Sequence, residues 1–94
     1  MSKNVLIVDD SATMRQMVRR TLRLSALCVD EVFEASNGIE ALAVMAEHPV
    51  TVLLLDINMP TMNGIQLLTR MKENERLANI PIVIASTEGS DERI

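Results

Sequence analysis

Four short apolar runs alternate with stretches of helical periodicity along the chain. The runs cover residues 5–8, 29–35, 50–55 and 82–85, and the first and third show no alternation of apolar and polar positions. Uninterrupted apolar runs of this length are typical of strands buried on both faces, as in parallel sheets. The second run is more polar around Val32 and Phe33, so it predicts a strand at the sheet edge.

The stretch between the first two runs predicts a helix that begins at Ser11 or Thr13, since either hydroxyl can accept a backbone hydrogen bond at a helix start. Arginines such as Arg15 and Arg19 fall mostly on one side of this helix, where we expect them to be solvated. The opposite, apolar face consists of Met14, Met17, Val18, Thr21 and Leu22.

Two further helices are expected, one before and one after the third run. Asn37 and Glu40 resemble a capping pair at the start of the first, which Pro49 ends. Asn63 can cap the second. The positions expected to face the core are Ile39, Leu42, Ala43 and Ala46 in one helix, and Ile65, Leu68 and Met71 in the other.

Strands that alternate with helices predict a single α/β domain, residues 1–94, with a doubly wound parallel sheet. Ser90 and the acids that follow it have the signature of another helix start, but the chain ends at Ile94. We therefore expect an incomplete, truncated fold of four strands, three helices and the start of a fourth helix.

Composition narrows the classes of function. Hydrophobic residues make up 48% of the chain and Phe33 is its only aromatic residue, so the core must be aliphatic and rich in methionine. A net charge of -4 argues against nucleic-acid binding. The lone Cys28 indicates a reducing, cytoplasmic location, and no apolar stretch approaches the ~20 residues of a membrane helix.

Carboxylates follow two of the apolar runs: Asp9 and Asp10 the first, and Asp56 the third. Since carboxyl ends of parallel strands share one sheet edge, we expect these acids and Ser86 to meet there. Three acids repel one another unless a cation lies among them, and Mg²⁺ prefers oxygen ligands. A carboxylate beside Mg²⁺ can accept a phosphoryl group, which a hydroxyl such as Ser86 could then bind.

Segments 5–11 (VLIVDDS) and 56–64 (DINMPTMNG) resemble the receiver domain of two-component response regulators. Segments 37–42 and 80–86 match in order and spacing, and segment 9–15 is especially similar to the stand-alone, CheY-like chemotaxis type. The resemblance covers essentially the whole chain. It implies a flavodoxin-like fold, a phosphoacceptor signalling domain rather than an enzyme, and a sensor histidine kinase as partner of the parent protein.

The resemblance assigns roles residue by residue. Asp56 matches the phosphoacceptor, and Asp9 and Asp10 match the acidic pair that holds Mg²⁺. The backbone carbonyl of Asn58 would join the metal shell. The remaining matches are Ser86 to the switch hydroxyl, and Asn58 and Glu88 to two variable positions that modulate the lifetime of the phosphoryl group.

The family's essential lysine, at the end of a fifth strand, has no counterpart here. The chain has only Lys3, before the first strand, and Lys72, on the third helix. We therefore expect phosphorylation of Asp56 to be impaired, and self-catalysed phosphorylation only in the full-length parent.

A different class of function is a truncated or engineered fragment that acts only as an assembly unit. Without a fifth strand, the strand that begins at Ile82 and ends at Ala85 is an apolar edge. Each large side chain left unburied there forfeits roughly 1.5–3 kcal/mol, so we expect a homodimer or an element-swapped oligomer. An aspartyl-phosphate phosphatase is disfavoured because Asp9 and Asp10 are adjacent rather than spaced as Asp-x-Asp, and no GK[ST] loop indicates a nucleotide hydrolase.

Overall fold

The computed structural model describes residues 3–24, 29–56 and 64–84. Within these ranges strands and helices alternate, as the sequence predicts. The elements are β1 (Asn4–Val8), α1 (Ala12–Leu24), β2 (Glu31–Ala35), α2 (Gly38–Glu47), β3 (Val52–Leu55), α3 (Gly64–Lys72) and β4 (Ile82–Ile84).

The four strands form one sheet in the order β2-β1-β3-β4, and every described pair is parallel. In this register Leu6 of β1 lies between Phe33 of β2 and Leu53 of β3. The chain moves from β1 to one side for β2 and to the other side for β3, so the strand order reverses at β1. This arrangement confirms the doubly wound α/β fold, and it makes the carboxyl ends of β1 and β3 the expected ligand-binding edge.

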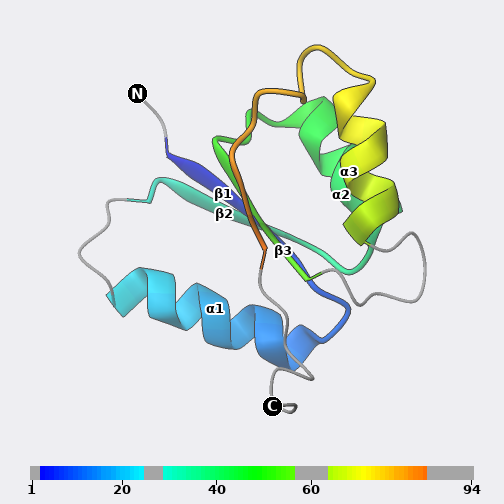
Figure 1. The fold of residues 1–94 in the computed structure, drawn as a ribbon. Coiled ribbons are helices and arrows are strands. Elements are labelled where there is room, and N and C mark those ends of the chain that lie inside the picture. Colours follow the sequence, from blue (N-terminus) through cyan, green and yellow to red (C-terminus); the bar gives the residue numbers. More distant parts are fainter. Residues whose placement is uncertain (1–2, 25–28, 57–63, 85–94) are drawn as a thin grey trace.

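Helices cover both faces of the sheet: α1 lies on one face, and α2 and α3 lie together on the other (Figure 1). The main core fills the space between the sheet and the α2–α3 layer. Its aliphatic character and its methionines confirm the expectation from composition. The buried members are Leu6, Val8, Ala35, Ala41, Met45, Leu53, Leu55, Leu67, Met71 and Leu77.

The inward faces of α2 and α3 differ in part from those predicted, although Met71 is buried as expected. Ile39 and Ile65 were expected in the core, but 57% and 61% of their surfaces are exposed. The buried pairs are Ala41 with Met45, and Leu67 with Met71. Apolar residues occur around much of both helices, so spacing alone could not identify the buried face. Ala43 and Ala46, also predicted inward, are exposed, whereas Leu42 and Leu68 are half-buried.

Side-chain caps fix the starts of two helices. The Ser11 hydroxyl accepts a hydrogen bond from the Met14 amide at 3.2 Å, which confirms one of the two predicted caps of α1. At α2, Asn37 Oδ1 accepts from the Glu40 amide at 2.9 Å. The Glu40 carboxylate accepts bonds from the amide and hydroxyl of Ser36, and these hold the pKa of Glu40 below its ordinary value.

Polar contacts attach α1 to the sheet. None of its residues is fully buried. Arg15 and Arg19, expected in a solvated face, instead lie half-buried and bind the carboxylate of Glu34 on β2 at 2.9 and 3.5 Å. The prediction was wrong for these two arginines because their partner comes from a strand that periodicity does not relate to the helix.

The ends of the strands also shift slightly. The third strand begins at Val52 rather than at residue 50. His48, the residue that caps the end of α2, stacks on Phe33 with ring centroids 4.6 Å apart. Residues 85–94, with the helix start expected at Ser90, lie outside the described residues. Among the described helices, none has the length and apolar character to cross a membrane.

Two adjacent leucines of β3, Leu53 and Leu54, provide a direct test of this packing. Leu53 is fully buried against α2 and α3, whereas Leu54 points to the opposite face and is only half-buried. We expect Leu53→Ala to lower the free energy of unfolding by about 2–5 kcal/mol, because it leaves a cavity in the core. Leu54→Ala should cost clearly less. Urea unfolding followed by circular dichroism measures both, and equal losses would contradict the assignment of the core face.

Candidate cation site

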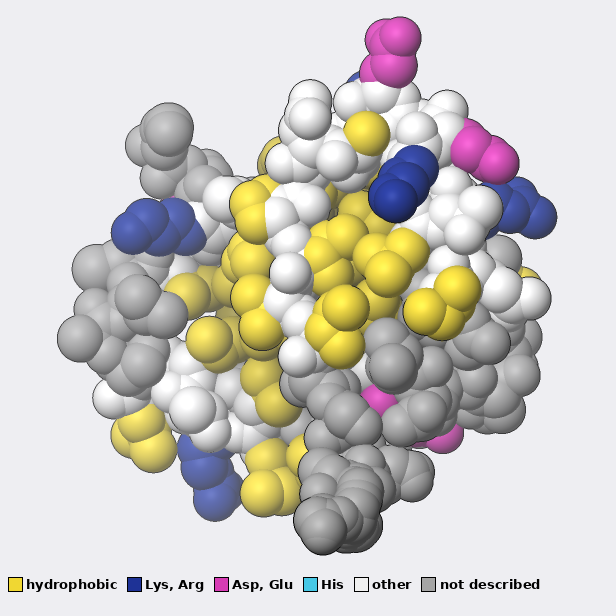
Figure 2. All heavy atoms as spheres, in the orientation of Figure 1, with side chains coloured by type: hydrophobic (Ala, Val, Ile, Leu, Met, Phe, Trp, Pro, Cys, Tyr) yellow, Lys and Arg dark blue, Asp and Glu magenta, His cyan; other side chains and the backbone are white. Residues whose placement is uncertain are grey.

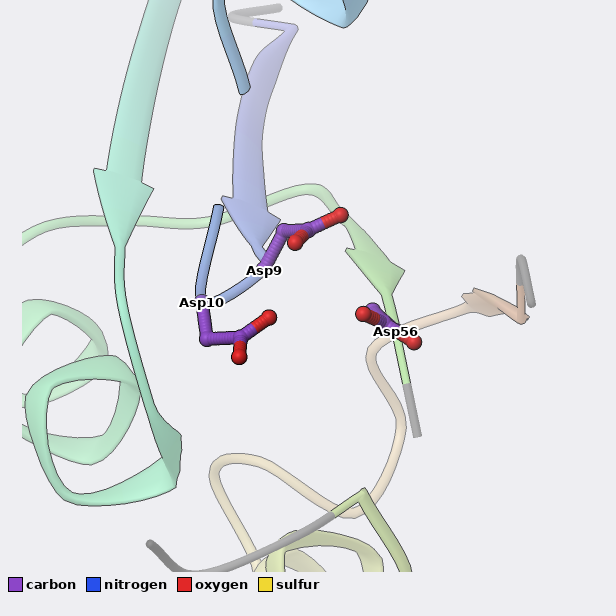
Figure 3. A group of neighbouring side chains, drawn as sticks. All are labelled: Asp9, Asp10 and Asp56. Carbon is purple, nitrogen blue, oxygen red and sulfur yellow. The ribbon is translucent and has the colours of Figure 1, made fainter. Parts of the chain in front are cut away.

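Three carboxylates meet at the carboxyl edge of the sheet. Asp9 directly follows β1, Asp10 is the next residue, and Asp56 directly follows β3. One oxygen from each can be chosen so that all three lie within 4.8 Å of one another. Figure 3 shows the side chains facing a common space between the two strand ends. The expectation that these three acids converge is therefore confirmed.

The parallel register brings Asp9 and Asp56 together. Val8 and Leu55 are partners across the β1–β3 pair, so each acid lies one residue beyond a matched position. The Asp56 amide donates to the Val8 carbonyl at 2.9 Å, and the Asp9 amide donates to the Ala35 carbonyl at 3.1 Å. Backbone pairing thus extends past the strand ends and holds the main chain of both acids.

Asp9 and Asp56 are nearly enclosed, with exposed fractions of 5% and 4%, whereas Asp10 is exposed. Burial raises the pKa of Asp9, and the neighbouring charges of Asp56 and Asp10 raise it further. A hydrogen bond from the Ser11 amide to Asp9 Oδ1, at 2.9 Å, opposes this change but does not cancel it. The folded domain therefore resists ionisation of Asp9.

This donor set fits a divalent cation. A hard cation such as Mg²⁺ takes carboxylate oxygens as ligands and keeps several waters. Here two enclosed carboxylates offer oxygens, while the exposed Asp10 leaves one side of the cluster open to solvent. A bound cation would also favour the ionised form of Asp9, which the surroundings otherwise disfavour.

The other predicted site residues, Asn58, Ser86 and Glu88, lie outside the described residues, so their roles stay predictions. Both lysines are described. Lys3 precedes β1, and Lys72 is the last residue of α3, so both lie away from the strand ends that carry the acids. Among the described residues, neither lysine lies at the edge that carries the three carboxylates.

One contact at this edge was not predicted. The Arg15 guanidinium on α1 donates to the backbone carbonyl of Asp9, while its Nε binds Glu34. The sequence does offer a signal, because Arg15 and Arg19 are four residues apart and so lie on one side of a helix. The strand residue that they share could not be found from that spacing.

The raised pKa of Asp9 makes stability depend on pH. The proton on Asp9 is bound more tightly in the folded domain than in the unfolded chain, so folding is favoured while Asp9 is protonated. Without divalent cations, the free energy of unfolding of wild type relative to Asp9→Asn should fall as pH rises above 3.8, the ordinary pKa of Asp, and level off above the folded pKa. Urea unfolding across this range measures the difference.

Mg²⁺ should reverse the loss. At about 100 times its dissociation constant, a ligand adds about 2.7 kcal/mol to the free energy of unfolding. We expect this gain at neutral pH in wild type and a smaller one in Asp9→Asn. Glu73→Gln, an exposed change beyond the far end of α3, serves as the matched control and should behave as wild type. Equal gains in wild type and Asp9→Asn would exclude Asp9 as a ligand.

Residues 5–94 match the family described as the response regulator receiver domain. A chemotaxis protein CheY homolog of Campylobacter jejuni is 40% identical over 86 residues, or 90% of this chain and 65% of that protein. The structure of chemotaxis response regulator CheY4 of Vibrio cholerae aligns with a TM-score of 0.79 at 32% identity, over 98% of this chain and 76% of that chain. The structure of the phosphorylated cyanobacterial phytochrome response regulator RcpA aligns with a TM-score of 0.82 at 26% identity. The alignment covers 94% of this chain and 67% of that chain.

These matches and the acid cluster agree with the resemblance found in the sequence. The chain spans 65% of the length of the Campylobacter protein, so it corresponds to about two thirds of such a relative. Its four-stranded parallel sheet with helices on both faces is the fold shared with the solved structures. The chain belongs to the response regulator receiver domain family and is CheY-like.

Proposed function

We propose that this chain is the phosphoacceptor domain of a chemotaxis-type response regulator, in which Asp56 takes a phosphoryl group while Mg²⁺ is bound. One observation carries the proposal: three carboxylates on neighbouring strand ends each place one oxygen within 4.8 Å of the others, and two of the three are nearly enclosed. In a receiver domain, this arrangement suits acids that bind a cation and supply a nucleophile.

The chemistry follows from the positions of the acids. A carboxylate oxygen of Asp56 attacks the phosphorus of a phosphohistidine on a sensor kinase, the phosphorus–nitrogen bond breaks, and its electron pair leaves with the histidine. The product on Asp56 is an acyl phosphate. Asp9 and Asp10, together with Asp56 itself, would hold Mg²⁺, which would offset negative charge on the phosphoryl oxygens. The rigid strand ends orient Asp56 for the attack.

The remaining roles are proposed on the family pattern. The Asn58 carbonyl would complete the metal shell, the Ser86 hydroxyl would bind the phosphoryl group, and Asn58 and Glu88 would modulate its lifetime. With no lysine beside the acids, we expect transfer to Asp56 to be slower than in relatives that have one. The domain then acts as a signalling acceptor that is modified, not as an enzyme that turns over a substrate.

Mass spectrometry tests the acceptor. After incubation with Mg²⁺ and acetyl phosphate, a small acyl-phosphate donor, we expect one phosphoryl adduct that hydroxylamine removes, as it does from an acyl phosphate. Asp56→Asn should abolish the adduct, because the amide is not a comparable nucleophile. Asp30→Asn, which changes an exposed acid remote from the cluster, should leave it intact.

The negative result is equally clear. If wild type forms no adduct under conditions that label a full-length relative, this chain does not function as an acceptor. An adduct that persists in Asp56→Asn would show that another residue accepts the phosphoryl group. Chelation of Mg²⁺ should lower the yield, and an unchanged yield would remove the cation from the proposal.

A second candidate function, assembly through β4, rests on a separate observation. Val83 and Ile84 are 52% and 53% exposed in the described part of the chain. Hydrophobic side chains gather on the face where β4 runs (Figure 2). Beside β4, a groove of about 330 Å³ is lined mainly by aliphatic side chains, among them Val5, Leu54 and Val83. An apolar edge of this kind favours pairing with a second copy or an exchanged element.

The oligomeric state tests this candidate. We expect native mass spectrometry to detect a homodimer, and Val83→Lys to shift the population to monomer because a charge would enter the apolar contact. Gln16→Lys introduces a lysine on the exposed side of α1 instead and should leave the dimer intact. A wild-type chain that stays monomeric and melts cooperatively would rule out assembly through this edge.

A further inference from the structure

Both polar groups of the Asp9 main chain, the amide and the carbonyl, are hydrogen-bonded. Its amide donates to the Ala35 carbonyl on β2 at 3.1 Å. Its own carbonyl accepts a hydrogen bond from Arg15 Nη1 at 2.5 Å. In its carboxylate, Oδ1 accepts a hydrogen bond from the Ser11 amide at 2.9 Å.

Arg15 is itself fixed. Its Nε donates to Glu34 Oε1 at 2.9 Å, and the two side chains are only 16% and 30% exposed. A planar guanidinium that binds two acceptors at once has little freedom to rotate. Arg15 therefore connects three elements, because it lies on α1, binds β2 through Glu34, and binds the residue that follows β1.

Arg19 provides a comparison within the same helix. It lies one turn further along α1 and contacts the same carboxylate, with Nε 3.5 Å from Glu34 Oε2. It also binds a backbone carbonyl, but that of Val32, the second residue of β2, at 3.1 Å. Both arginines tie α1 to β2, and only Arg15 adds a bond to a member of the acid cluster.

We propose that Arg15 is a positioning residue for the cation site, which holds the carbonyl of Asp9 and thereby the direction of its carboxylate. The inference rests on the proposed binding of Mg²⁺ by Asp9, Asp10 and Asp56. Arg15 acts through Asp9 and binds neither the cation nor the phosphoryl group. Partners that orient a metal ligand from behind commonly change metal affinity 10–100-fold when they are replaced.

A purely electrostatic role predicts the opposite result. A guanidinium near the site repels a cation, so its removal by Arg15→Gln would tighten cation binding, and Arg15→Lys, which keeps the charge, would change nothing. A positioning role predicts weaker binding in both variants, because a lysine lacks the fork that binds Glu34 and the Asp9 carbonyl together. The Lys variant therefore separates geometry from charge.

The experiment measures the dissociation constant of Mn²⁺, from the electron paramagnetic resonance signal of the free ion, with Mg²⁺ as competitor. We expect Arg15→Lys to weaken binding at least about tenfold. Arg19→Lys loses a comparable contact with Glu34 and should bind as wild type. Circular dichroism establishes that each variant is folded at the temperature of the titration.

The outcomes distinguish the inference from the function on which it rests. If wild type binds no Mn²⁺, the cation site fails and the inference fails with it. If wild type binds and Arg15→Lys binds equally well, only the positioning role is overturned. Should Arg15→Lys fail to fold, the double change Arg15→Met with Glu34→Met removes the clamp without leaving an unpaired carboxylate, and unchanged affinity in that variant overturns the proposal.

Discussion

Repulsion among three carboxylates is the constraint on which the rest of this domain depends. One oxygen from each can be chosen so that the three lie within 4.8 Å of one another, and two of the three side chains are nearly enclosed. The parallel pairing of β1 with β3 brings two of them together, because it places Asp9 and Asp56 one step beyond a matched pair of residues. The sheet and its core therefore offset an electrostatic cost that would otherwise separate the strand ends.

The core is arranged to support that edge more firmly than the rest of the sheet. Leu6 and Leu53, on the two central strands, are fully buried beneath α2 and α3. The opposite face carries α1, of which no residue is fully buried, and the outermost strand β4 leaves Val83 half exposed. Burial is thus greatest along β1 and β3, whose ends carry the acids, and least at β4.

The sequence predicted the parts of the fold that depend on local pattern. Uninterrupted apolar runs identified β1 and β3, and the acids that follow these runs identified the candidate site. The sequence did not identify the buried faces of α2 and α3, because helices with apolar residues on several sides, including Ile39 and Ile65, leave the face to be decided by tertiary packing. The contact of Arg15 with the Asp9 carbonyl could not be predicted from the sequence, because Arg15 and Glu34 come together only when α1 packs across β2.

The shallow burial of α1 gives the cation site a link to local unfolding. A helix with no fully buried residue, such as α1, detaches from a domain at a lower free-energy cost than one embedded in the core. Detachment of α1 would withdraw Arg15 from Asp9, so the detached form would bind a cation more weakly. Thermodynamic reciprocity then requires that a bound cation suppress the detachment of α1 by the same factor. Cation binding at the sheet edge would thereby stabilise the docked position of α1, although α1 supplies none of the three carboxylates.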